Sequence, residues 1–575
     1  MLRRTAFALL SALSLLAGAA QASEPRLEVT PFLGSVASSA WQPFTITVTN
    51  PANAPAISGE VRLHLSDQRR GYDNLGNWSR PVQLSPGSST QVTITANVPY
   101  GTLPIAEVTL VQGTGQASST VASEKFEGLR IRPGNAITVL NLSRNAEALS
   151  QIDNLETAFV VHGGAIIANS APMGSGYGER VAKSSARFRS RVQVSPLAPE
   201  ELPTDALGLD SVTAVYTDRT TTLTPEQQRV IENYVGSGGL VVTEATDKDS
   251  IASQGLGVRA SLRPNSVAGW RNALHQRAMQ SSVLSGIGYG VGSDYYGLGQ
   301  VVVVGDGTAP LPFDSLLLFL GAYIVILVPV QYAVLKRLGK REWAWGVTPA
   351  LAVLFALAAY GFGQRGRSRE SFLNVASVVE LNAGSATGRA LSSVGLFSPS
   401  HSNYDLGVKS SGALRLSDTE SFGGSAESLV DGVPTLRNLS VPMWSIRRTS
   451  ALAEVTLGKG LEIKRAGDKV TLTNNTGQTI RALRIGGYTT LNQLEPGQTE
   501  TVSAPDWRNA GYPLNLYTTD AATQRMTQRL WSLVVSRDTN ATITGWLDTS
   551  PLTIQLNGKS VTAKHQATML VVHVP

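Results

Sequence analysis

The chain has 575 residues and no cysteine, a composition that excludes disulfides, thiolate metal sites and cysteine nucleophiles. Apolar residues make up 42% and charged residues 16%, and this length predicts about three or four domains with cores of their own. The net charge of +6 comes from basic residues in no long run or stripe, so the sequence lacks the clustered footprint of a nucleic-acid binder. The six histidines are scattered singly, so the sequence indicates no metal site and no cofactor.

Residues 1–22 have the pattern of a signal peptide. Arg3 and Arg4 form a charged start, residues 5–17 are apolar but too few to span a membrane stably, and residues 20–22 form a small-x-small cleavage site. The sequence therefore predicts export of the chain from residue 23 onward. Ala19 stands where a lipoprotein would carry its lipidated cysteine, so any membrane attachment must lie elsewhere.

Residues 23–135 are expected to form an immunoglobulin-like β-sandwich. Apolar and polar residues alternate in short runs such as 44–49 and 91–98, and Asn50-Pro51 and Pro86-Gly87 are turn signals. Several short strands separated by turns are typical of two packed sheets.

The same signals recur near the other end of the chain. Val48-Thr49-Asn50 is followed by Leu84-Ser85-Pro86-Gly87, and Leu472-Thr473-Asn474 is followed by Leu494-Glu495-Pro496-Gly497. In both places a strand is expected to end in an asparagine turn, and a Pro-Gly turn is expected to open a later strand. The repeat favours a second sandwich at the C-terminal end.

Residues 136–309 change character and predict an α/β domain. Thr224 is a good N-cap, Pro225 suits the first helical position and Gln227 completes a capping-box spacing, so a helix is expected over about 225–235. Strands that alternate with helices indicate a largely parallel, covered, Rossmann-like sheet. The expected strands are 136–142, 157–162, 211–216, 240–243 and 300–304, with a further helix over 144–152.

The stretch 223–242, LTPEQQRVIENYVGSGGLVV, resembles the class I glutamine amidotransferase-like superfamily. The whole arrangement resembles an uncharacterised family of bacterial membrane proteins with exported amidotransferase-like and immunoglobulin-like domains. That family's function is unknown, so the resemblance implies a fold rather than an activity. Amidotransferases use a cysteine nucleophile and this chain has none, so we expect that chemistry to be absent and the protein not to be an enzyme.

A candidate ligand crevice lies in the α/β domain. His162, Gly163 and Gly164 follow one expected strand and Asp306 follows another, and parallel sheets bind ligands outside the carboxyl ends of their strands. The alternative is that the glycines form a strand-end turn and that Asp306 caps nearby backbone. The sequence indicates no catalytic residue.

Residues 315–335 and 343–363 are uncharged runs of about 21 residues, the length of a membrane-spanning helix, so such helices are expected over 313–335 and 343–363. The loop 336–342 between them carries Lys336, Arg337, Lys340 and Arg341, and such a basic loop favours the cytoplasmic side. The sequence thus predicts a transmembrane hairpin in the bacterial cytoplasmic membrane, with both the N- and the C-terminal domains on the extracytoplasmic side.

The tail is expected to form a β-rich extracytoplasmic region over 370–445 and a terminal β-sandwich over 446–575. Alternating runs at 374–381, 469–472, 479–485 and 530–535 indicate strands.

Three hypotheses of function remain open. The first is a non-enzymatic, membrane-anchored cell-envelope protein whose exported domains bind or scaffold a partner, either an envelope protein or a glycan. The second is a transport or sensing component that holds a ligand in the α/β crevice, and the third is a hydrolase with an unrecognised site. The spans make the lipid bilayer a direct partner, and nucleic acid is not expected.

Overall fold

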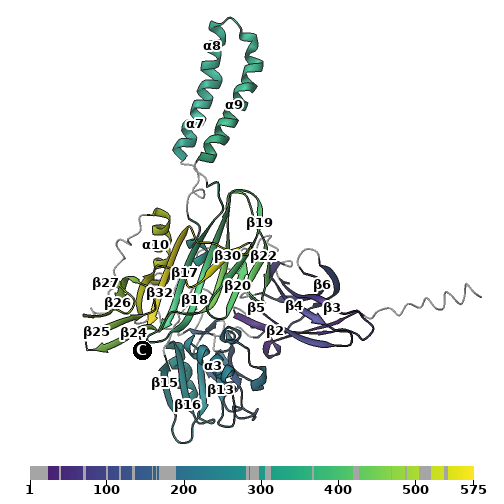
Figure 1. Cartoon of the computed structure of the whole chain (residues 1–575), viewed down its shortest axis with the longest axis vertical. Coiled ribbons are helices and arrows are strands. Elements are labelled where there is room, and N and C mark those ends of the chain that lie inside the picture. The colour runs from purple at the N-terminus through teal and green to yellow at the C-terminus, as the bar shows by residue number, and fades with distance from the viewer. Residues whose placement is uncertain are drawn as a thin grey trace, which may run out of the picture.

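The computed structural model describes a multidomain, β-rich body from which a helical hairpin projects (Figure 1). The segment predicted as a signal peptide lies outside the described residues. These are 24–574 except 38–39, 69–72, 99–101, 115–117, 133–135, 158–159, 163–164, 168–189, 255, 280–283, 285–296, 305–312, 366–367, 419–425, 468, 486–487, 504–519 and 536–541.

Two facing sheets form the N-terminal part of the body. Side chains alternate across a strand, so the second strand turns Phe44 and Ile46 inward, where they share a core with Leu63 of the opposite sheet. The packed pair agrees with the sandwich that the alternating runs predicted. One sheet has the order β1 (Arg26–Pro31), β2 (Ala40–Thr49) and β5 (Ser89–Val98), and the other contains β3 (Ile57–Asp67), β4 (Asp73–Leu84), β6 (Pro104–Gln112) and β7 (Ser119–Phe126), with the short helix η1 (Phe32–Gly34) between β1 and β2.

The next segment forms a mainly parallel sheet with a helix on each face. Its order is β15-β16-β14-β13-β8-β12-β9, and the five inner strands run parallel. Helix α3 (Pro225–Gly236) packs against Val215 on one face, and α4 (Val267–Met279) packs against the neighbouring Tyr216 on the other. Thr224 and Gln227 form a complete capping box, which confirms the predicted helix. The strands are β8 (Ala136–Asn141), β9 (Glu156–Thr157), β12 (Ser190–Pro196), β13 (Ala214–Thr217), β14 (Leu240–Glu244), β15 (Ser250–Gln254) and β16 (Gly257–Leu262), with the short helices η3 (Pro199–Glu201) and η4 (Ala206–Leu209) before β13.

Two expected elements of this segment are absent from their predicted places. Residues 144–152 form successive turns rather than a helix, because the Asn141 side chain binds the carbonyl of Asn145 and the N–H of Ser143. Residues 300–304 are not a strand, since α6 (Leu298–Val301) covers their start. The Asn374 side chain donates to the carbonyls of Val302 and Val304 at 2.8 Å each, which occupies the groups that a strand would offer to a sheet.

The run 530–535 was expected to be a strand and instead lies in helix α10 (Ala521–Val535). The Asp520 carboxylate accepts the N–H groups of the first turn and caps the helix. Met526, Leu530 and Val534 recur every four residues and are all buried on one face. The six residues 530–535 alone show an alternation typical of a strand, and the four-residue spacing of a helix becomes visible only over a longer stretch.

The tail builds an eight-stranded sheet at the centre of the body, in the order β20-β23-β18-β17-β32-β29-β26-β27. β17 (Phe372–Asn382) pairs in parallel with β32 (His565–His573), so the predicted division at 445 falls between strands that share one sheet. One face packs on the tail strands of the nine-stranded sheet, and the other carries α6 and α10. The remaining strands are β18 (Thr387–Ser398), β19 (Ser402–Lys409), β20 (Leu414–Asp418), β21 (Glu427–Leu429), β22 (Thr435–Val441), β23 (Ser445–Thr456), β24 (Gly460–Ala466), β25 (Lys469–Asn475), β26 (Ile480–Ile485), β27 (Tyr488–Leu494), β28 (Thr499–Ser503), β29 (Thr542–Leu547), β30 (Thr553–Leu556) and β31 (Lys559–Ser560), of which β24, β25 and β28 form a small separate sheet.

The nine-stranded sheet combines strands from before and after the helical hairpin. Its order is β31-β30-β19-β22-β21-β4-β3-β6-β7. The junction is the parallel pair of β21 and β4, in which Glu427 lies opposite Asn77. Arg437 of β22 also forms a 2.7 Å ion pair with the buried Glu60 of β3. The two halves of the chain are therefore joined through one sheet.

Both asparagine turns that the sequence repeat predicted are present and equivalent. The Asn50 N–H donates to the Ser88 carbonyl at 2.8 Å, and the Asn474 N–H donates to the Gln498 carbonyl at 3.0 Å. Each acceptor directly follows a Pro-Gly turn whose glycine has a φ of +72° at Gly87 and +80° at Gly497.

The hairpin consists of two long apolar helices that run side by side away from the body (Figure 1). The first comprises α7 (Phe313–Val325), a π-helical segment (Ile326–Val330) around Pro329 and α8 (Gln331–Arg337). The second comprises η7 (Arg341–Trp343) and α9 (Ala344–Arg365). The candidate spans Leu317–Arg337 and Arg341–Gly361 have mean hydropathies of 2.2 and 1.6. A helix of this length reaches about 31 Å, which matches the hydrocarbon core of a bilayer.

Candidate functional site

The predicted crevice falls largely on residues outside the described structure. His162 ends β10 (Val160–His162), which among the described strands pairs with β11 (Ala165–Ile167) in a two-stranded ribbon outside the seven-stranded sheet. Gly163, Gly164, Asp306 and the side chain of His162 lie outside the described residues. Asp306 does not follow a sheet strand, because residues 300–304 form none. The crevice therefore stays a prediction, without the strand end that was expected to place Asp306.

Polar and aromatic contacts hold the two hairpin helices together. The Gln331 side chain is buried between them and donates to Thr348 Oγ1 at 2.8 Å. The Phe355 ring meets those of Phe319 and Tyr323 edge-on, with centroids 5.5 and 5.0 Å away. In an apolar solvent such interhelical hydrogen bonds and close ring packing take the place of the hydrophobic effect.

The distal end of the hairpin is basic and aromatic. Lys336, Arg337, Lys340 and Arg341 are all exposed, and within the described residues no ion pair joins any of them to a carboxylate. The Lys340 ammonium lies 5.0 Å from the centre of the Trp343 ring. These are the four basic residues that were expected to orient the hairpin, and the structure places them together between the end of α8 and the start of α9.

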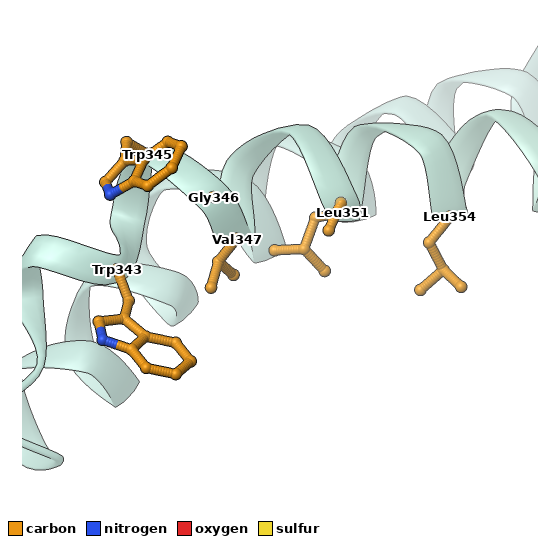
Figure 2. Close-up of a pocket in the computed structure, with 7 residues that line it drawn as sticks. Trp343, Trp345, Gly346, Val347, Leu351 and Leu354 are labelled. Atoms are coloured by element: carbon orange, nitrogen blue, oxygen red, sulfur yellow. The ribbon is translucent and has the colours of Figure 1, made fainter.

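An apolar groove runs from this tip along α9. Figure 2 shows Val347, Leu351 and Leu354 pointing to the same side of the helix, with the Trp343 ring beside them. Gly346 adds no side chain to the groove, and a Cβ placed there would meet no atom within 4 Å. The groove and the basic loop together are the candidate functional site of the described structure.

A second polar cluster joins the α/β unit to the eight-stranded sheet. Arg415 of β20 binds both oxygens of Asp205, which precedes η4, at 2.8 and 2.7 Å. Glu454 of β23 accepts from the Asn233 side chain of α3 at 3.2 Å. Burial raises the pKa of Glu454, Asp205 raises it further, and the nearby guanidinium of Arg389 opposes both. These contacts are internal and partnered, so the cluster fixes the α/β unit on the sheet.

Two histidine–carboxylate pairs lie on strand β32, and sequence reasoning missed both. His565 Nδ1 lies 2.6 Å from Asp520, and His573 Nε2 lies 2.6 Å from the buried Glu380. Burial raises the pKa of Asp520, but hydrogen bonds from Thr523, Ala522 and His565 outweigh it and hold that pKa well below its usual range. Their signal in the sequence is the even separation of eight positions that puts both histidines on one face of β32.

Neither pair extends to a catalytic triad in the described part of the chain. A hydrolase of that type needs a serine hydroxyl hydrogen-bonded to the imidazole. The buried Nε2 of His565 has no hydrogen-bond partner, and the hydrogen bond of His573 goes to a carboxylate. Among the described residues there is also no group of three or more metal-ligating side chains.

Comparison with known proteins gives a family match for the N-terminal segment alone. Residues 26–127 match the model of a domain of unknown function, DUF8726. This match gives no support to the amidotransferase resemblance. No curated protein matches the chain.

The solved structures that resemble the chain do so weakly. The yeast delta-COP-I mu-homology domain, in complex with a peptide, is 6% identical with a TM-score of 0.18, over 36% of this chain and 96% of that one. A member of glycosyl hydrolase family 2 from Bacteroides cellulosilyticus is 10% identical with a TM-score of 0.15, over 93% and 78% of the chains. A Bacteroides uniformis β-glucuronidase is 9% identical with a TM-score of 0.14, over 96% and 61%.

These neighbours contradict the expectation that the chain is not an enzyme, because several of them are glycoside hydrolases. We therefore withdraw that expectation. At TM-scores near 0.15 the same neighbours assign no activity and no substrate to this chain.

Proposed function

We propose that the protein is a membrane-anchored scaffold of the bacterial cell envelope. The hairpin crosses the cytoplasmic membrane, and the β-rich body outside it holds a partner, either an envelope protein or a glycan. The observation that carries the proposal is the exposure of the hairpin, where Leu318 and Leu357 are 78% and 65% exposed. In water such a continuous apolar surface would drive association, whereas in lipid it is solvated.

The strand pairing supports two crossings rather than one. β4 comes before the hairpin in the chain and β21 comes after it, yet the two are hydrogen-bonded neighbours. Both flanks of the hairpin must then lie on the same side of the membrane. The basic tip favours the cytoplasm, and the export signal in residues 1–22 favours a body on the other side.

The finer descriptions of the domains belong to this proposal. We infer an amidotransferase-like arrangement for the α/β unit from the succession of α3, a turn in which Gly238 has a φ of +99°, and β14. An immunoglobulin-like character for the terminal β segments is supported by the matching turns at Asn50 and Asn474.

Single cysteines test the topology cleanly, because the chain has none of its own. Glu226→Cys and Lys469→Cys lie at exposed positions of the body, and Leu338→Cys lies at the tip. A membrane-impermeant maleimide should label the first two in spheroplasts and the third only after the membrane is permeabilised. Labelling of the tip cysteine in intact spheroplasts would exclude the proposed orientation.

The scaffold role needs a partner. A photo-crosslinking amino acid at Glu226, on the unit farthest from the hairpin in Figure 1, should capture one defined envelope component. The same residue at Leu338 is the matched control and should not capture it. Recovery of no component from any exposed position of the body would contradict the scaffold role.

A further inference from the structure

The groove on α9 and the basic loop next to it form one continuous surface with two chemistries. The aliphatic side chains of Val347, Leu351 and Leu354 line the groove along α9, and Gly346 contributes no side chain that would fill it (Figure 2). Trp343 closes the end that meets the loop. The groove is therefore open along the helix and bounded at the tip.

The charge lies at the closed end. Four basic residues stand within the seven residues of 336–342, with Glu342 as the one acid, which leaves a net charge of +3 on the loop. Lys340 lies over the ring of Trp343, so the same indole borders the groove and carries a cation above it. An occupant that complements this surface has an aliphatic chain of several carbons and an anionic group at one end.

We propose that this surface binds an anionic phospholipid of the cytoplasmic leaflet. One acyl chain lies along Val347, Leu351 and Leu354, and the phosphate lies against Lys340 and its basic neighbours. Clusters of lysine and arginine beside a membrane helix are known to select anionic headgroups. The choice among lipids comes from the headgroup, because the apolar groove is equally suited to the chain of any phospholipid. The inference rests on the proposed membrane insertion of the hairpin.

Direct lipid titration tests the site. The full-length protein in detergent is titrated with phosphatidylglycerol or with phosphatidylcholine, and the bound lipids are counted by native mass spectrometry. We expect one phosphatidylglycerol to bind about tenfold more tightly than phosphatidylcholine. Lys340→Gln combined with Arg341→Gln should abolish the preference, and Lys340→Arg should keep it.

The groove has a matched pair of glycine variants. Gly346→Leu fills it, whereas Gly361→Leu adds the same side chain to the same helix outside it, and neither new Cβ meets an atom within 4 Å. The first variant should lose the bound lipid and the second should retain it. Equal binding of the two lipids by the unchanged protein, or retention of the lipid by Gly346→Leu, would overturn the proposal. A mass corresponding to two chains that is lost in Gly346→Leu would assign the groove to a helix of a second copy instead.

The same preparation separates this inference from the proposed function. If the unchanged protein is absent from alkali-washed membranes, membrane insertion itself is wrong. If it is present there and shows no preference for phosphatidylglycerol, only the lipid site is wrong.

Discussion

Replacing Asn474 by alanine should loosen the C-terminal turn more than the equivalent change at Asn50 loosens the N-terminal one. The Asn474 side chain is fully buried and donates to the carbonyls of Gln478 and Leu494, both at 2.8 Å. Its Oδ1 accepts from the N–H and the hydroxyl of Thr476 at 3.0 and 2.7 Å. Each net hydrogen bond contributes about 1 kcal/mol, so Asn474→Ala should cost about 3–4 kcal/mol.

Asn50 donates to the carbonyls of Pro55 and Ser85 at 2.9 and 3.2 Å, while its Oδ1 accepts no hydrogen bond in the described structure. The same arithmetic gives about 2 kcal/mol for Asn50→Ala. Asn475→Ala is the control, since Asn475 is only partly buried and its strand end is the same.

Hydrogen exchange with mass spectrometry on the detergent-solubilised protein measures the local opening. Amides around residues 474–498 should exchange roughly 150- to 700-fold faster in Asn474→Ala, because every 1.4 kcal/mol is a factor of about ten. Asn475→Ala should match the unchanged protein. If Asn474→Ala exchanges no faster than Asn475→Ala, or if Asn50→Ala has the larger effect, the hydrogen-bond account is refuted.

Three further predictions concern ionisation and assembly. Because the pKa of Glu454 is raised in the folded state, its contribution to stability is fully present below the ordinary value of 4.5 and is lost as pH rises through the folded-state pKa. Glu454→Gln should therefore lose less thermal stability than the unchanged protein as pH rises to about 7. An equal fall of the melting temperature with pH in the two proteins would count against this. The lowered pKa of Asp520 has the opposite sign, and its contribution exists above the ordinary value of 3.8 and is lost in acid. Asp520→Asn should therefore melt below the unchanged protein at about pH 7, and the difference in melting temperature should narrow steadily as pH falls below about 3.8, whereas a constant difference would show that charge is not involved. A fragment that ends at Val304 leaves β4 without its neighbour β21 and should elute as large aggregates, and a monodisperse fragment would show that this edge needs no partner.

The sequence predicted correctly those elements that are stabilised by residues close together in the chain. The capping box at Thr224 and Gln227, the two asparagine turns and the two apolar helices all depend on residues within a few positions of each other. The strand order could not be foreseen in the same way. β17 pairs with β32 across about 190 residues, and alternation shows that a strand exists without showing its neighbour.

The misassigned segments have a common physical cause. In residues 300–304 and 530–535 a short apolar run looked like a strand, and a polar side chain elsewhere decided the outcome. Asn374 takes the carbonyls of the first run, and Asp520 caps the helix that contains the second. The candidate site also has a predictable and an unpredictable part. The basic loop could be predicted, because its four charges lie close together in the sequence. The groove could not, because it depends on which face of α9 the first helix leaves uncovered.

The contacts between the α/β unit and the central sheet matter for the proposed scaffold role. Asn382 of the central sheet bonds the Leu256 N–H at 2.7 Å and the Gly236 carbonyl at 3.0 Å, and Arg415 holds Asp205 nearby, so the α/β unit is fixed to the sheet. That sheet starts at β17, the first strand after α9, and the α/β unit lies at the opposite end of the body from the hairpin (Figure 1). A partner bound to the α/β unit would therefore be held in a fixed position relative to the central sheet. A flexible linker could not do this, since its ends separate only as the square root of its length. The proposal of a scaffold thus depends on the internal ion pairs of the junction as much as on the hairpin that anchors it.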